Sequence, residues 1–282
     1  MAERRTTSGR LLDGRVAIVT GGGGGIGGAI SALFAEHGAR VVVVDVDAER
    51  AHATASAIAE AGGAAQAVIA DVRLPEASQQ IVDRTVSAFG PPTALVNNVG
   101  HYISPGRPFH ETTEEHWHAL HEVNLLHVFR VTKAVLPAMI DHGRGGTIVN
   151  VSSVEAYRGA PNQAVYGAYK AGVAHFTKCL ALDVAEHGIR VNDIAPDVTR
   201  SLQLPYERWL TEDDQARIPQ WVPIGRLGEP VDPASVALFL TSDLSAFVTG
   251  TTIHVDGGTR AAGGWFRTKH GPRTWTNRPY DP

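Results

Sequence analysis

The chain has 282 residues, 43% hydrophobic and 19% charged, so it can bury a sizeable core and is not disordered in bulk. Its formal charge of −4 argues against nucleic-acid binding, and its single cysteine, Cys179, excludes an intramolecular disulfide or an unaided zinc site. No apolar run is long enough to span a membrane and no apolar leader is visible, so we expect a cytoplasmic protein without membrane contact.

Short β-branched runs alternate along the chain with longer alanine-rich segments whose apolar residues recur at helical spacing. The β-branched runs predict strands over Val16–Thr20, Val41–Val44, Val68–Ala70, Thr93–Val96, Thr147–Val151, Ile189–Ile194 and Thr252–Val255. The alanine-rich segments predict helices over Ile26–His37, Asp47–Gly62, Pro75–Phe89, about 113–140, about 164–187 and Pro233–Leu240. Thr112 and Glu115 have capping-box spacing at the start of the longest of these helices.

Strict alternation of apolar strands and helices is typical of a parallel sheet covered on both faces. We therefore expect an α/β fold, a Rossmann-type doubly wound sheet of about seven strands in a single domain, with its ligand at the carboxyl ends of the strands. The predicted organisation is an N-terminal arm (1–11), a catalytic domain (12–258) and a C-terminal tail (259–282). The stretch 197–230 lacks a regular pattern and is predicted to be a lid or substrate loop.

Seven of the 30 glycines lie between Gly21 and Gly28, between the first predicted strand and the first predicted helix. Glycines there permit a tight turn and close approach of the backbone to a pyrophosphate, which the helix N-terminus attracts. A merely flexible glycine linker is the alternative. The strand–turn–helix context favours a dinucleotide site in this glycine turn.

Asp45 ends the second predicted strand, near the offset at which an acid binds the adenosine ribose. A carboxylate there repels the 2′-phosphate of NADP. The following residue is Val46, and the loop carries no Lys or Arg to receive that phosphate. Both features favour NAD. The alternative for Asp45 is a polar strand terminus without a ligand.

Tyr166 and Lys170 are four residues apart and therefore share one face of a predicted helix. A nearby ammonium lowers the pKa of a phenol, so the pair predicts a tyrosine that acts as a general acid and base. By spacing alone, an incidental pair on an amphipathic helix stays open.

These residues belong to a larger set of motifs that resembles the classical short-chain dehydrogenases/reductases. The resemblance runs from Leu12 to about Thr259 in the order and spacing of that family. The matching motifs are Thr20–Gly27, Asp71-Val72, Asn97–Gly100, Asn124, Ser152-Ser153, Tyr166-xxx-Lys170, Pro196 and Asp256–Gly258. The resemblance specifies the family strongly and the substrate weakly.

The resemblance implies a catalytic set of Asn124, Ser153, Tyr166 and Lys170. Tyr166 would move the hydroxyl proton, Lys170 would lower its pKa and hold the nicotinamide ribose, Ser153 would bind the substrate oxygen, and Asn124 would hold a relay water. The implied cofactor-binding residues are Gly21, Gly25, Ile26, Gly27, Asp45, Asp71, Val72, Asn98, Gly100, Tyr166, Lys170 and Thr199. Asp197, Asp193 and Val99 depart from the family pattern, and Asp193 has no explanation in the sequence.

A strongly apolar and aromatic set predicts a bulky, largely apolar secondary alcohol or ketone as substrate. Its members are His101, Tyr102, Val154, Glu155, Tyr157 and, from the lid, Leu202, Leu204, Tyr206, Trp209, Leu210 and Trp221. The alternative is that these lid residues pack the lid onto its own domain. His116, His118 and His121 do not share one helix face, so we expect no metal site.

The tail carries Trp265, Phe266, Trp275 and Tyr280, interleaved with Arg267, Lys269, Arg273 and Arg278. We expect it to dock on a neighbouring subunit, with a basic RNA-binding tail as the rival. The resemblance suggests a homotetramer that pairs the helices near 113–140 and 164–187. The expected function is NAD-dependent interconversion of an alcohol and a ketone. A 3-oxoacyl-thioester reductase and a non-catalytic NAD sensor or scaffold are the alternatives.

Overall fold

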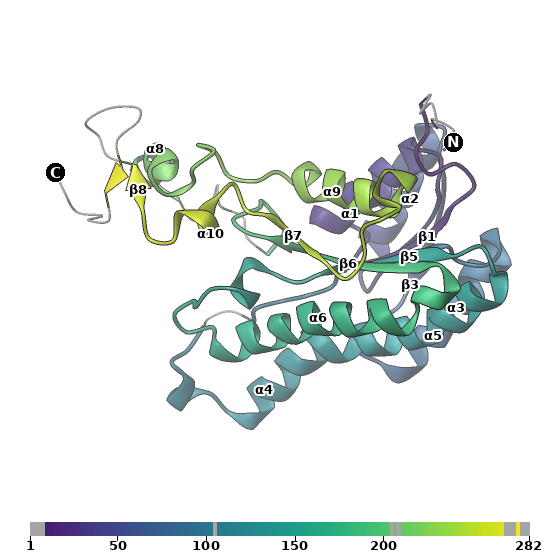
Figure 1. Cartoon of the computed structure of the whole chain (residues 1–282), viewed down its shortest axis with the longest axis horizontal. Helices are drawn as coiled ribbons and strands as arrows, with labels where there is room; N and C mark the ends of the chain where they lie inside the picture. Colours follow the sequence, from purple (N-terminus) through teal and green to yellow (C-terminus); the bar gives the residue numbers. More distant parts are fainter. Residues whose placement is uncertain (1–8, 104–105, 204–205, 207–209, 268–274, 277–282) are drawn as a thin grey trace.

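The structure, a computed structural model, describes residues 9–103, 106–203, 206, 210–267 and 275–276 (Figure 1). Its centre is a seven-stranded parallel sheet in the order β3-β2-β1-β4-β5-β6-β7. The strands are β1 Val16–Thr20, β2 Arg40–Asp45, β3 Ala64–Ile69, β4 Ala94–Asn97, β5 Gly146–Val151, β6 Ile189–Pro196 and β7 Thr252–Val255. The chain direction across the sheet reverses between β1 and β4, which creates a switch point for a ligand. The predicted fold class is confirmed.

Helices cover both faces of the sheet, as Figure 1 shows. One face carries α1 (Gly25–Glu36), α2 (Ala48–Glu60) and α9 (Val231–Thr241), and the other carries α3 (Pro75–Phe89), α5 (His127–His142) and α6 (Ala164–Asp183). Each layer buries its own apolar cluster, with Phe34 in the first and Ile81 in the second. Successive valines of β2 pack alternately into the two clusters, so the strand is apolar on both faces. This explains the continuous β-branched runs of the sequence.

The third strand is longer than expected. It begins at Ala64 rather than Val68, because every residue of Ala64–Ile69 pairs with a residue of β2. Small alanines carry little β propensity of their own, so the neighbouring strand decides their conformation.

The longest predicted helix is a composite of α4 (Glu114–His121), a π-helical turn η2 (Glu122–Leu126) and α5. The predicted capping box is wrong by one residue. Thr113 caps α4 by accepting from the N–H of His116 at 3.3 Å, whereas the Thr112 hydroxyl donates to the carbonyl of Phe109 at 2.7 Å. A threonine that bonds backward to a preceding turn is unavailable as a cap.

The helical run Glu114–His142 is the one candidate for a membrane span, by length and composition, within the described part of the chain. Val131, Val135 and Met139 of this run are fully buried against the sheet in the second cluster. It therefore packs as a core helix.

The segment 197–230 contains an unexpected helix, α8 (Glu212–Trp221), which begins with a capping box between Thr211 and Asp214. Ile218, Val222 and Leu227 form a small apolar cluster beneath it, against which Leu210 and Trp221 pack. For these two side chains the alternative of internal lid packing is therefore correct. Leu204 and Trp209 lie outside the described residues.

The C-terminal segment continues past β7 into α10 (Thr259–Ala262) and a two-stranded ribbon of β8 (Phe266–Arg267) and β9 (Trp275–Thr276). In Figure 1 this ribbon lies beside α8, at the opposite end of the molecule from the N-terminus. Within one chain the tail therefore contacts its own lid. Lys269, Arg273, Arg278 and Tyr280 lie outside the described residues.

Candidate active site

A cleft of about 770 Å³ lies at the carboxyl ends of the strands. Most of the residues selected from the sequence line it: Gly21, Gly25, Ile26, Asp45, Asp71, Val72, Asn98, Gly100, Ser153, Tyr166, Lys170 and Thr199. Gly27 and Asn124 do not. Both lie beneath the lining residues and hold them in position.

The glycine turn brings α1 very close to β1 and β4. A Cβ atom on Gly27 would lie 2.1 Å from the carbonyl oxygen of Gly21 and 2.5 Å from Nδ2 of Asn98. Asn98 in turn donates from Nδ2 to the carbonyl of Thr20 at 3.0 Å. No side chain caps the start of α1, so its first N–H groups face the cleft and can bind an anion.

Asp45 lies at the adenosine end and is held by three donors. Its carboxylate accepts from the N–H of Gly23 at 3.1 Å, from the N–H of Asp47 at 3.0 Å and from Nη2 of Arg50 at 3.2 Å. The sequence reasoning missed Arg50, because it considered only the loop. Arg50 stands in the first turn of α2, and the helix directs its guanidinium back to the end of β2.

Asp71 and Val72 lie across the same end of the cleft. Arg73 forms a bidentate ion pair with Asp71, with Nη2 2.6 Å from Oδ2. This hydrogen bond holds the pKa of the Asp71 carboxyl below its usual range. Arg73, like Arg50, lines the cleft and was not predicted.

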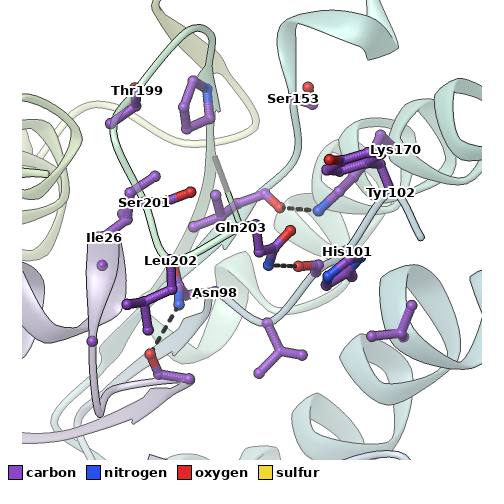
Figure 2. A pocket seen from close by; sticks show the side chains of 18 of the residues that line it. Ile26, Asn98, His101, Tyr102, Ser153, Lys170, Thr199, Ser201, Leu202 and Gln203 are labelled. Atoms are coloured by element: carbon purple, nitrogen blue, oxygen red, sulfur yellow. Dashed lines mark hydrogen bonds between the residues drawn. The ribbon is translucent and has the colours of Figure 1, made fainter. Parts of the chain in front are cut away.

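Lys170 lies at the other end of the cleft and is almost fully buried. Its Nζ donates to the carbonyl of Val151 at 2.9 Å (Figure 2), and a Cβ atom on Gly100 would lie only 2.5 Å from that nitrogen. Glycine at position 100 therefore leaves room for the ammonium. Burial lowers the pKa of Lys170 to about 8, and the charge of Asp193 opposes that effect.

Ser153 and Tyr166 line the same cleft as Lys170. The Ser153 hydroxyl accepts from the N–H of Glu155 at 3.2 Å. Burial raises the pKa of Tyr166 to about 12, while the neighbouring Ser153 hydroxyl lowers it and the charges of Glu155 and Asp197 raise it further. The net direction is opposite to the one expected from Lys170, whose Nζ is 5.9 Å from the centre of the phenol ring.

Asn124 is fully buried in the π-helical turn. Its Nδ2 donates to the carbonyls of His101 (2.8 Å) and Leu120 (2.9 Å), and its Oδ1 accepts from the N–H of His101 (3.0 Å). Asn124 therefore fastens the loop after β4 to the helix behind Lys170. π-Helical turns inside α-helices are frequent at functional sites.

The segment after β6 borders the catalytic end. The Thr199 hydroxyl donates to the carbonyl of Asp197 at 2.7 Å, so its proton is already engaged. Asp197 accepts from Thr259 and forms an ion pair with Arg158 at 2.9 Å. Asp197, which departs from the family pattern, is thus a carboxylate whose negative charge is neutralised by the guanidinium of Arg158.

The predicted substrate residues divide into two groups. His101, Tyr102, Glu155, Leu202 and Tyr206 line the cleft. Val154 and Tyr157 do not: Val154 is fully buried, and the Tyr157 hydroxyl is bonded to Thr252 at 2.6 Å.

Two neighbouring lid residues, Leu202 and Gln203, extend into the cleft, and Gln203 was not predicted. Figure 2 shows both side chains between Ile26 and Lys170. Nε2 of Gln203 donates to the carbonyl of Gly100 at 2.6 Å, and Leu202 lies against Gly24. The described residues contain no group of three metal-ligating side chains.

Comparisons with known proteins agree with this geometry. Residues 21–260 match the family model described as enoyl-(acyl carrier protein) reductase. The chain is 39% identical over 248 residues to 3β-hydroxysteroid dehydrogenase 1 of Eggerthella lenta, a match that covers 88% of this chain and 94% of that protein. It is 38% identical over 247 residues to a 3-oxoacyl-(acyl-carrier-protein) reductase of Thermotoga maritima, which covers 88% and 98% of the two chains.

A solved structure extends the comparison to three dimensions. It is a 7α-hydroxysteroid dehydrogenase in complex with NADH and 7-oxo glycochenodeoxycholic acid, with a TM-score of 0.82 and 35% identity, over 88% of this chain and 94% of that one. Shared sequence and shared fold over most of both chains confirm the family and the enzyme class that the motifs predicted. The chain therefore belongs to the short-chain dehydrogenase/reductase family and is an oxidoreductase that acts on CH–OH groups.

Proposed function

We propose that this enzyme uses NAD to interconvert a bulky, largely apolar secondary alcohol and its ketone. The observation that carries the proposal is one continuous cleft with Asp45 at one end and the set Ser153, Tyr166 and Lys170 at the other. A relative and a solved neighbour that are named hydroxysteroid dehydrogenases support a cyclic alcohol as the substrate.

The residues present fit a dinucleotide. The cradle at Gly21 and Gly27 admits no Cβ atom, and the uncapped start of α1 suits a pyrophosphate. Asp45 would bind the adenosine ribose, Asp71 and Val72 would border the adenine, and Asn98 would border the adjoining ribose region. Lys170 and the backbone near Thr199 would hold the nicotinamide half. The bound nicotinamide supplies the hydride acceptor or donor.

The proton chemistry belongs to Tyr166, with Ser153 holding the oxygen of the substrate. The phenol donates its proton to that oxygen when a ketone is reduced and accepts it when an alcohol is oxidised. Because burial raises the pKa of Tyr166 to about 12, the neutral phenol is stable at neutral pH. Oxidation requires a tyrosinate, which the Lys170 ammonium stabilises.

The wall next to Tyr166 limits the substrate. Tyr102, Leu202 and Tyr206 supply aromatic and apolar surface. Glu155 places a carboxylate there: its Oε1 is paired with Arg158 at 3.0 Å, and its buried Oε2 has no hydrogen-bond partner among the described residues. A second hydroxyl on the substrate would satisfy that oxygen, whereas a substrate carboxylate would be repelled.

Asp45 argues against one alternative function, a 3-oxoacyl-thioester reductase, and the catalytic set argues against the other, a non-catalytic NAD sensor. A 3-oxoacyl-thioester reductase, which the Thermotoga maritima relative suggests, would be expected to prefer NADP, and Asp45 opposes it. A non-catalytic NAD sensor has no need of Ser153, Tyr166 and Lys170 together.

The deciding experiment is a panel of steroid, cyclic, acyl-thioester and polyol substrates, followed as NADH and NADPH absorbance. We expect NADH-linked turnover of cyclic or steroid substrates. Turnover of acyl thioesters with NADPH would favour the reductase, and NAD binding without turnover of any substrate would favour the sensor. Turnover of polyols alone would refute the apolar pocket.

We also propose a cytoplasmic homotetramer with the division into arm (1–11), catalytic domain (12–258) and tail (259–282). Large apolar side chains such as Leu182 and Phe247 are exposed on the single chain, which supports association. Whether the tail also reaches a neighbouring subunit is tested by light scattering on the full chain and on a chain ending at Gly264. A tail at a subunit interface predicts a smaller assembly for the shortened chain.

A further inference from the structure

Asp193, near the end of β6, is a fully buried carboxylate to which the function proposed above gives no part. Its Oδ1 accepts from the N–H of Ser152 at 3.0 Å. Its Oδ2 accepts from the hydroxyls of Ser152 at 2.6 Å and Thr252 at 3.0 Å. A buried carboxylate is costly unless donors or a counter-charge satisfy it, so this arrangement constrains all the groups around it.

The network ties the catalytic turn to the next two strands. Ser152 directly precedes Ser153, and Thr252 begins β7 on the other side of β6. The Tyr157 hydroxyl belongs to the same hydrogen-bond network: it lies 2.6 Å from Oγ1 of Thr252 and 3.5 Å from Oδ2 of Asp193. The Tyr157 ring contacts His254 edge-on and lies under the guanidinium of Arg260. His254 and Arg260 are the other titratable groups at this site.

Lys170 approaches the same place from α6. Its Nζ donates to the carbonyl of Val151, which pairs with Ile194 in the ladder, one position beyond the pairing of Asn150 with Asp193. The ammonium is buried and needs a counter-charge. In the described part of the chain no ion pair joins the two groups, but the charge of Asp193 raises the pKa of Lys170.

The other titratable groups around Lys170 do not supply that charge. Tyr166, on the same helix, is a neutral phenol at neutral pH. His127, from α5, is fully buried, and burial together with the charge of Lys170 lowers its pKa to about 3, so it is neutral as well.

We propose that Asp193 is a positioning residue of this enzyme, which anchors the Ser152–Ser153 turn and serves as the buried counter-ion that keeps Lys170 an ammonium. The inference rests on the proposed function, because the ammonium is the form of Lys170 that holds the nicotinamide ribose and stabilises a tyrosinate. It also explains the acidic residue that the sequence left unexplained.

The pair has a defined working range. Burial raises the pKa of Asp193 to about 6, so its carboxylate forms above that pH, and Lys170 keeps its proton up to about pH 8. Both charges are therefore present between these values. Below the range the aspartate is neutral, and above it the lysine is neutral.

The test compares Asp193→Asn, which keeps the shape and loses the charge, with Thr252→Val, which removes one hydrogen bond and keeps the charge. NADH affinity is measured by fluorescence between pH 5.5 and about 9.5, together with kcat/KM for ketone reduction. In the wild type we expect both to fall above about pH 8. In Asp193→Asn that fall should begin about one pH unit lower, and in Thr252→Val it should stay within a few tenths of a unit.

The loss of kcat/KM in Asp193→Asn should itself depend on pH. At pH 8 we expect Asp193→Asn to lose about fivefold in kcat/KM, whereas at pH 5.5 it should approach the wild type, in which Asp193 is then largely protonated. Asp193→Ser, a smaller uncharged variant, should show the same shift if the asparagine variant does not fold.

Two results would overturn the proposal. One is an unchanged alkaline fall in both uncharged variants. The other is an equal loss at every pH with a lower melting temperature, which would assign Asp193 a purely structural role. If the wild type turns over no alcohol or ketone, the proposed function fails, while the NADH titration still reports on the pair of Asp193 and Lys170.

Discussion

The two ends of the cleft are built in different ways. At the adenosine end, Asp45 and the glycine turn lie where strands β2 and β1 stop, so local strand–turn–helix geometry positions them. At the substrate end, the walls come from loops after β4, β5 and β6 that are far apart in the chain, and Gln203 reaches the carbonyl of Gly100 from the lid. Local geometry therefore specifies the cofactor, whereas long-range packing shapes the substrate pocket.

The largest expected effect separates chemistry from binding. Tyr166→Phe removes the proton donor and keeps the ring, so turnover should fall about 10³-fold while NADH affinity stays within a few-fold. Steady-state rates and NADH fluorescence measure the two quantities. A variant that keeps more than a tenth of the wild-type rate would assign the proton transfer to another group.

Cofactor choice tests the adenosine end alone. Asp45→Ser removes the carboxylate that repels a 2′-phosphate and releases Arg50 to receive it, so the preference for NAD over NADP should shift by roughly 100-fold toward NADP. The ratio of kcat/KM values for the two cofactors measures the shift. The control is Asp45→Ser with Arg50→Ala, which should lose most of the gain. An equal gain in both would deny Arg50 this role.

Stability tests the catalytic end without any substrate. Burial lowers the folded-state pKa of Lys170 to about 8, below its ordinary 10.5. The folded protein is therefore destabilised by the buried ammonium at and below about pH 8. This penalty disappears as the pH rises to about 10.5, where the lysine is neutral in both states. Lys170→Met should raise the free energy of unfolding at pH 7 by about 2 kcal/mol, with turnover nearly abolished.

Urea unfolding at several pH values measures that difference. It should shrink as the pH rises from 8 towards 10.5, because the wild-type lysine is then neutral in the folded state. A constant difference over this range would mean that Lys170 is not a buried charge.

The smallest expected effect concerns the space around the ammonium. Gly100→Ala puts a Cβ atom against Nζ of Lys170, the movable end of a flexible side chain, so stability should change little while kcat/KM falls about tenfold. Gly159→Ala is the matched control, since nothing lies within 4 Å of a Cβ atom there. Equal activities of the two variants would contradict the close approach of Lys170.

Much of this molecule could be predicted from periodicity and spacing. Val16–Thr20 is both the predicted and the observed first strand, because β-branched residues buried on two faces have few other conformations. Spacing failed where a hydrogen-bond partner outside the pattern decides. Ala64 joins β3 because the distant strand β2 pairs with it, and Thr112 bonds to the preceding turn at Phe109 instead of capping α4.

The site shows the same division. Tyr166 and Lys170 share a helix face by spacing alone, yet the direction of the tyrosine pKa depends on burial, which spacing does not report. Arg50 went unnoticed because its partner lies in another element.

The sequence by itself determined the parallel sheet and the glycine turn, which rest on local conformation, and the family, which rests on the order of its motifs along the chain. Only the tertiary structure decided that Leu202 and Gln203 enter the cleft, that Tyr157 leaves the substrate wall, and that Asp193 binds Ser152. The physical reason is that burial and electrostatic interaction depend on distances between segments far apart in the chain, and packing alone sets those distances.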